Sequence, residues 1–113
     1  MEKEVVDKMY EEWIDAKFAH IFERYKRMVK ELYKIDEATL CSKKKHTLTL
    51  RFVRTIYVHS CINKGVPYMI VSKSLNRTSN TTLHNVKTYA DMYKTDQYFK
   101  YLADMALLWD EKH

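Results

Sequence analysis

Apolar residues recur at helical spacing along most of the chain, and this pattern predicts an all-α fold. Over residues 3–35 one apolar series steps alternately by four and three residues, like the a and d positions of a coiled coil: Ile14, Phe18, Ile21, Tyr25, Met28, Leu32 and Ile35. A second row broadens the stripe and holds Val6, Met9, Trp13, Phe22, Val29 and Tyr33. We expect one helix of roughly 50 Å, whose stripe packs on its own domain, forms a dimer interface, or does both.

Two further segments are predicted to be buried helices, separated from the first by a loop over residues 36–46. Residues 47–63 are rich in β-branched side chains, yet an apolar series repeats there at helical spacing: Leu48, Phe52 and Ile56. His59 is expected to be a packed or partly exposed histidine and not a ligand. Residues 95–110 carry a second series that predicts a closing helix: Tyr98, Leu102, Met105 and Trp109, with Phe99, Ala106 and Leu108 beside them. With one Gly and one Pro the chain has few turn-forming residues, which argues against an all-β fold.

Residues 66–94 predict a helix-turn-helix, with one helix over 66–75 and a second over 78–94. Gly65 suits the end of the preceding helix and Pro67 suits a first helical position. Thr78 can cap the second helix by accepting from its free backbone N–H groups. The predicted core face of that helix holds Leu83, Val86, Ala90 and Tyr93. The opposite face carries short hydrogen-bonding side chains, typical of a helix in the DNA major groove or of an ordinary polar face: Thr81, His84, Asn85 and Thr88.

Basic residues are concentrated in the middle of the chain. The formal net charge is +5, which favours an anionic partner without identifying it. Residues 38–90 contain no Asp or Glu and nine basic residues: Lys43, Lys44, Lys45, Arg51, Arg54, Lys64, Lys73, Arg77 and Lys87. Because this block coincides with the predicted helix-turn-helix, we interpret it as a phosphate-facing surface rather than a solvated face.

Several other classes of function find little support in the sequence. No run of 18 apolar residues predicts a membrane span, and the charged N-terminal segment does not resemble a signal peptide. Cys41 and Cys61 fit no metal-ligand spacing and are expected to stay reduced in a cytosol. The five histidines show no paired spacing with carboxylates. We therefore expect no catalysis, no metal and no cofactor.

The stretch LNRTSNTTLHNVK, from Leu75 to Lys87, resembles the signature of the DNA-binding domain of bacterial DnaA-type replication initiators. Arg77, Thr81, Leu83, His84 and Lys87 match that signature. The departures are Thr78, Ser79 and Asn80, which stand where the family has Asp, His and Thr or Ser. The resemblance covers about residues 43–110, and the same fold is shared by the Trp repressor. The chain has no P-loop motif, so it lacks the family's nucleotide-hydrolysing signature.

The resemblance implies binding to duplex DNA, with the second helix of the motif in the major groove and a basic loop in the adjacent minor groove. By this likeness Thr78, Ser79, Asn80 and Thr81 face base edges, and Asn80 can pair with adenine. Arg77 and Lys87 hold phosphates. The whole expected DNA-binding set is Lys43, Lys44, Lys45, His46, Arg54, Lys73, Arg77, Thr78, Ser79, Asn80, Thr81, His84 and Lys87.

The sequence thus predicts a helical arm over residues 1–37 and a DNA-binding domain over residues 38–113. The leading hypothesis is that the protein is a non-enzymatic, sequence-specific regulator of replication or transcription, associated with the nucleoid in the cytoplasm. A homodimer paired through the arm would prefer half-sites about one helical turn apart, or a multiple of that. The alternative is a protein-interaction module that docks a partner through the arm, with a basic surface that is incidental or binds RNA.

Overall fold

The computed structural model describes residues 2–113, and the side chains from Asp7 onward. Within that range the chain forms six α-helices and no strand, which confirms the all-α prediction. The helices are α1 (Glu2–Tyr33), α2 (Glu37–Leu40), α3 (Leu48–Asn63), α4 (Tyr68–Ser74), α5 (Ser79–Thr95) and α6 (Gln97–Lys112). The short helix α2 lies inside the segment predicted to be a loop. It begins at Asp36, whose side chain accepts a hydrogen bond from Thr39 N.

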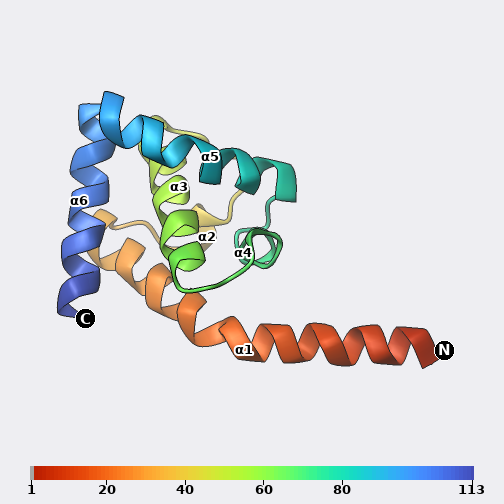
Figure 1. Ribbon diagram of the computed structural model, residues 1–113. Helices are drawn as coiled ribbons and strands as arrows, with labels where there is room; N and C mark the ends of the chain where they lie inside the picture. Colours follow the sequence, from red (N-terminus) through yellow and green to blue (C-terminus); the bar gives the residue numbers. More distant parts are fainter. Residues whose placement is uncertain (1) are drawn as a thin grey trace.

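Helix α3 is the central element and packs against α1, α4, α5 and α6. Figure 1 shows the C-terminal half of α1 beneath this group, while its N-terminal, projecting half extends outward past α4. The molecule is accordingly elongated, with extents of 52 × 29 × 24 Å. None of the helices over residues 2–113 combines the length and apolar composition needed to cross a bilayer.

The a/d series of α1 packs on its own domain. Its buried members are Ile14, Phe18, Ile21, Tyr25 and Met28. Tyr25 is completely buried and its hydroxyl donates to the Asp110 carboxylate of α6, so a partner chain cannot use it. The apolar side chains that stay exposed on the projecting half are Met9, Tyr10 and Trp13. Of the second predicted row, the Val6 side chain lies outside the described residues.

The buried face of α5 is rotated from the predicted one. Leu83 is only half-buried and Val86 is exposed, whereas Thr82 and Tyr89 are buried. Hydrogen bonding explains Thr82, because its hydroxyl lies 2.6 Å from that of buried Ser72 in α4 and each group satisfies the other. The ring of Tyr89 is held by stacking and edge contacts with the rings of His59 and Phe99. His59 itself is half-buried, in line with the expectation of a packed or partly exposed histidine.

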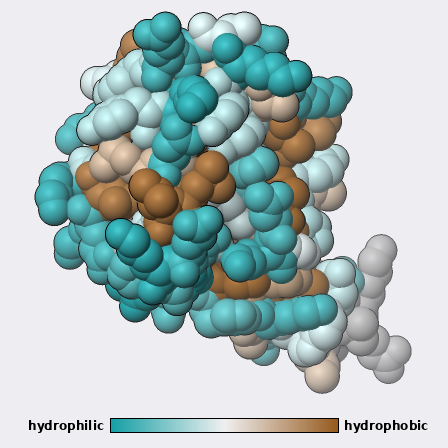
Figure 2. Space-filling model, turned by 60° about the vertical axis from the view of Figure 1, so that its left-hand side comes forward, coloured by the Kyte–Doolittle hydropathy of each residue, from teal (hydrophilic) through white to brown (hydrophobic). Residues whose placement is uncertain are grey.

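The buried face of α6 also differs from the predicted series. Phe99 is fully buried between Phe52 and Tyr89, and this places the neighbouring residue Tyr98 at the surface. Leu102 and Trp109 are buried as predicted. The remaining buried residues of α6 are Ala103 and Ala106. Its exposed apolar side chains include Leu107 and Leu108, and Figure 2 shows apolar side chains gathered on this side of the molecule.

Candidate nucleic-acid interface

The segment between α2 and α3 is held by one buried guanidinium. Arg54 of α3 donates to four backbone carbonyls: Nε to Leu40 O at 2.8 Å, Nη1 to Lys45 O at 2.9 Å, and Nη2 to Ser42 O at 2.8 Å and Thr39 O at 3.2 Å. The sequence placed Arg54 at the surface with the lysines, but the structure buries it. Arg54 therefore positions the segment instead of presenting its charge to a partner.

A second guanidinium reaches the same segment from the turn before α5. Arg77 Nη2 also donates to Ser42 O, so two cations share one carbonyl. Burial and the neighbouring Arg77 together lower the pKa of Arg54 to about 10, which leaves Arg54 charged at neutral pH. The hydrogen bonds tie the segment after α2 to the turn before α5. These hydrogen bonds therefore fix the distance between the segment after α2 and the turn before α5.

The tied segment presents a basic arm, which we define as Lys43, Lys44, Lys45 and His46. All four side chains are exposed. No ion pair of the described chain involves the three lysines. His46 Nε2 lies 2.7 Å from Lys43 O, which folds the end of the arm back on its start. The arm thus has a backbone held in place and positive side chains free for a partner.

The start of α5 exposes the predicted base-reading side chains only in part. The Thr78 hydroxyl caps the helix and accepts from Thr81 N at 3.3 Å, as predicted. Ser79 is half-buried, while Asn80, Thr81 and His84 are exposed within one turn of one another. The described protein offers no hydrogen-bond partner to the side chains of Asn80 and His84. These two are accordingly the most available to an external ligand.

One predicted cation, Lys73, lies apart from the basic arm. Lys73, in the last turn of α4, sits 3.9 Å from the carboxylate of Glu11 in α1. It lines a cavity between α1 and α4, which Arg77 and Ser79 also line. Lys87 is exposed on α5, two residues beyond Asn85 and six beyond Thr81. The structure therefore gathers the arm, Arg77 and the start of α5, whereas Lys73 is paired with α1.

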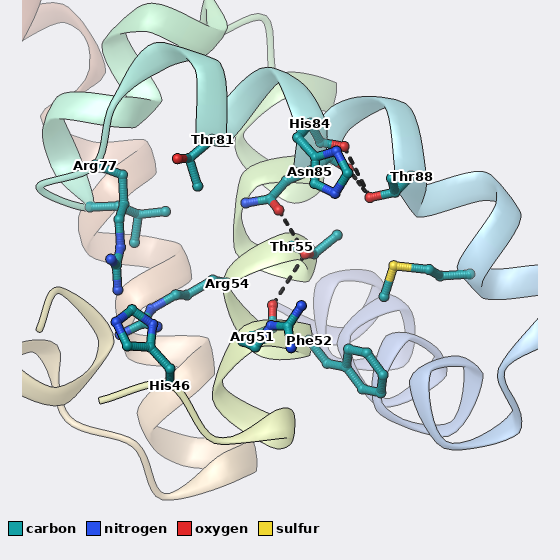
Figure 3. A pocket seen from close by; sticks show the side chains of 12 residues that line it. His46, Arg51, Phe52, Arg54, Thr55, Arg77, Thr81, His84, Asn85 and Thr88 are labelled. Carbon is teal, nitrogen blue, oxygen red and sulfur yellow. Dashed lines mark hydrogen bonds between the residues drawn. The ribbon is translucent and has the colours of Figure 1, made fainter. Parts of the chain in front are cut away.

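A groove of about 310 Å³ lies between the N-terminal half of α3 and the polar face of α5. Figure 3 shows Arg77, His46 and Arg54 converging at one end, while Arg51 lies below Thr55, next to Phe52. No carboxylate lines the groove. Its lining is His46, Arg51, Phe52, Arg54, Thr55, Leu75, Arg77, Thr81, His84, Asn85, Thr88 and Met92.

The expected DNA-binding set left out three polar residues of this groove: Arg51, Thr55 and Asn85. The sequence had placed Arg51 in the basic block and Asn85 on the polar face of the second motif helix, but it gave Thr55 no role. The Thr55 hydroxyl lies 3.1 Å from Arg51 O and 3.3 Å from Asn85 Oδ1, and it joins α3 to α5 at the floor of the groove. Arg51 is exposed and one turn before Arg54. The one-turn spacing from Arg54, in a block without acids, was the sequence signal that could have identified Arg51 as part of the site. The Thr55–Asn85 contact joins distant segments and had no local signal.

The fold and the groove define an all-α protein with a positively charged concave face. Within the described residues no cluster of His, Cys, Asp and Glu is suited to a metal ion. No protein-family model, curated protein or solved structure matches this chain. The likeness of Leu75–Lys87 to the DnaA-type signature accordingly stays a prediction.

Proposed function

We propose that this protein binds duplex DNA in a sequence-specific manner and regulates replication or transcription without catalysing a reaction. One observation carries the proposal. A single acid-free groove brings Thr81 and His84 of α5 together with Arg51, Arg77 and His46 of the basic arm. The resemblance of Leu75–Lys87 to the initiator signature supports the same reading. Phosphate neutralisation by such a surface supplies affinity, and the short polar side chains of α5 supply base contacts.

The parts have distinct roles in this proposal. The N-terminal turn of α5 enters the major groove, where Asn80, Thr81 and His84 meet base edges. Lys87 and Arg77 hold the phosphate backbone. The basic arm follows the backbone into the adjacent minor groove, at a distance from α5 that Arg54 fixes through Ser42. The contacts of α5 with base edges specify sequence, whereas the contacts with the phosphate backbone position the protein.

The test is selection from random duplex DNA with purified protein, followed by measurement of affinity against salt concentration. We expect an enriched motif. If the surface neutralises about five to seven phosphates, the slope of log affinity against log salt will be roughly −4 to −6. A slope near −1 would contradict the phosphate-facing surface. Retention that depends on salt but yields no motif would contradict sequence specificity.

A second candidate function is protein interaction through the projecting half of α1. The observation that favours it is the exposure of Met9, Tyr10 and Trp13, with Trp13 56% exposed. Side chains this large rarely cluster at the surface of a monomer without a partner. A second copy paired through these residues would form the homodimer described above, which would bind two DNA half-sites. The same surface could instead receive another protein.

Trp13→Glu is expected to weaken self-association at least tenfold, because it places a charge in the apolar contact. The melting temperature of the monomer should stay unchanged, since Trp13 is more than half exposed. Sedimentation equilibrium over a concentration series measures the association. Trp13→Phe keeps an apolar ring and serves as the control. A wild-type protein that is monomeric at every concentration would exclude the dimer.

A further inference from the structure

The groove between α3 and α5 contains positive charge that the protein itself does not neutralise. Three guanidiniums line it, those of Arg51, Arg54 and Arg77, together with His46 and His84. A buried charge is normally compensated by an opposite one. Here residues 38–90 supply no carboxylate, and none of the ion pairs in the described chain reaches the groove.

The hydrogen-bond inventory shows which donors remain for a ligand. Arg54 donates hydrogen bonds to four backbone carbonyls, so it offers a ligand in the groove a fixed positive charge and not a set of free donors. Arg77 uses only Nη2, on Ser42 O, and Arg51 uses none of its side-chain donors within the described chain. A guanidinium with free N–H groups matches a tetrahedral oxyanion, to which it can donate two parallel hydrogen bonds.

Like charges held this close repel each other, and an anion between them removes the repulsion. Arg54 and Arg77 share one carbonyl oxygen as their acceptor, so their guanidiniums are near neighbours. The hydroxyl of Thr81 and the ring of His84 line the opposite wall, on α5. The Thr81 hydroxyl adds a neutral donor that an oxyanion can use. The groove thus combines fixed charge, free donors and a concave shape, at the lower end of the volume range of small-ligand sites.

We propose that this groove is a phosphate-binding site, in which a phosphate group sits between Arg51 of α3 and Arg77 in the turn before α5. The choice of a DNA backbone phosphate as the natural occupant rests on the function proposed above. A free phosphorylated compound would present the same oxygens. A phosphodiester in the groove fixes α5 relative to one DNA strand, and a free phosphate compound would compete with DNA for the same place.

The first measurement is thermal unfolding of the whole protein with inorganic phosphate, at low millimolar concentrations and against sodium chloride of equal ionic strength. Low concentrations avoid the general stabilisation that phosphate gives by exclusion from protein surfaces. We expect a saturable rise in Tm, about 5 °C once phosphate exceeds its Kd tenfold. Arg51→Gln should abolish the rise. Lys64→Gln, which removes an exposed charge at the far end of α3, should keep it.

Amide chemical shifts provide a second readout on the same samples. Phosphate should shift the resonances of Arg51, Thr55, Arg77 and Asn85, and leave those of α6 unchanged. Absence of a saturable effect in both measurements overturns the site. A full effect in Arg51→Gln also overturns it, because phosphate would then be bound elsewhere.

The source of the phosphate is decided with duplex DNA. If the backbone is the occupant, Arg51→Gln lowers duplex affinity about tenfold, Lys64→Gln leaves it unchanged, and inorganic phosphate competes with DNA. If Arg51→Gln abolishes the phosphate effect but leaves duplex affinity unchanged, the site takes a free phosphate compound. A phosphate effect without any duplex binding supports the site and contradicts the proposed function, so the two failures are distinguishable.

Discussion

Arg54→Leu is expected to lower the free energy of unfolding by about 3 kcal/mol, because it leaves carbonyl oxygens in the α2–α3 segment without their donor. Leu40 O is the most costly of these, since its hydrogen bond with Arg54 is buried. Ser42 O keeps the Arg77 donor, and Lys45 O lies nearer to solvent. Removing a buried charge recovers part of the loss. The predicted change corresponds to a Tm roughly 10–20 °C lower.

Denaturant unfolding followed by circular dichroism measures this change, and Arg51→Leu is the matched control. Arg51 lies one turn earlier on the same helix, but it is exposed and makes no side-chain hydrogen bond, so we expect a change within about 0.5 kcal/mol. Arg54→Lys should fall between the two, because an ammonium keeps the charge but cannot reach all four carbonyls. Equal stability of Arg54→Leu and wild type would show that the guanidinium does not hold the segment.

Arg54→Leu also tests whether Arg54 anchors the basic arm that we expect to contact DNA. With Arg54 replaced, the backbone that carries Lys43, Lys44 and Lys45 loses its main anchor. Limited trypsin digestion should then cleave after these lysines faster than in wild type, under conditions where both proteins are folded. Unchanged cleavage would indicate that Arg77 alone keeps the basic arm in place.

The helices could be predicted because their signals are local. The a/d series of α1 and the cap at Thr78 lie within a few residues of the positions they determine, and both are present in the structure. Periodicity also identified α3 as a helix despite its β-branched residues. These features depend on backbone geometry and on burial of apolar side chains, which a single sequence expresses directly.

The errors arose where polar groups form the interior. Periodicity ranks positions by hydropathy, so it placed Leu83 and Val86 of α5 inside, whereas the structure buries Thr82 against Ser72. Arg54 was assigned to the surface for the same reason. Its acceptors are backbone carbonyls, which are present at every residue and so leave no mark in the sequence. Long-range hydrogen bonds of this kind decide which charges of the basic block remain available to a ligand.

Replacing Asn80 and His84 together by alanine is expected to reduce affinity for the selected DNA site about a hundredfold. Both side chains are exposed one helical turn apart on α5, and a well-formed base contact contributes roughly 1–3 kcal/mol of discrimination. Affinity for unrelated duplexes should stay the same, because neither change removes a phosphate-binding cation. Fluorescence anisotropy with the selected duplex and a scrambled duplex measures the ratio.

Lys87→Ala provides the contrasting variant on the same helix. Loss of one phosphate contact should weaken binding to both duplexes alike and reduce the salt slope by about one. The stability of Asn80→Ala/His84→Ala should change by less than about 0.5 kcal/mol, since these side chains have no partner in the described protein. If the double variant weakens both duplexes equally, α5 contributes charge or shape to binding but does not read the bases.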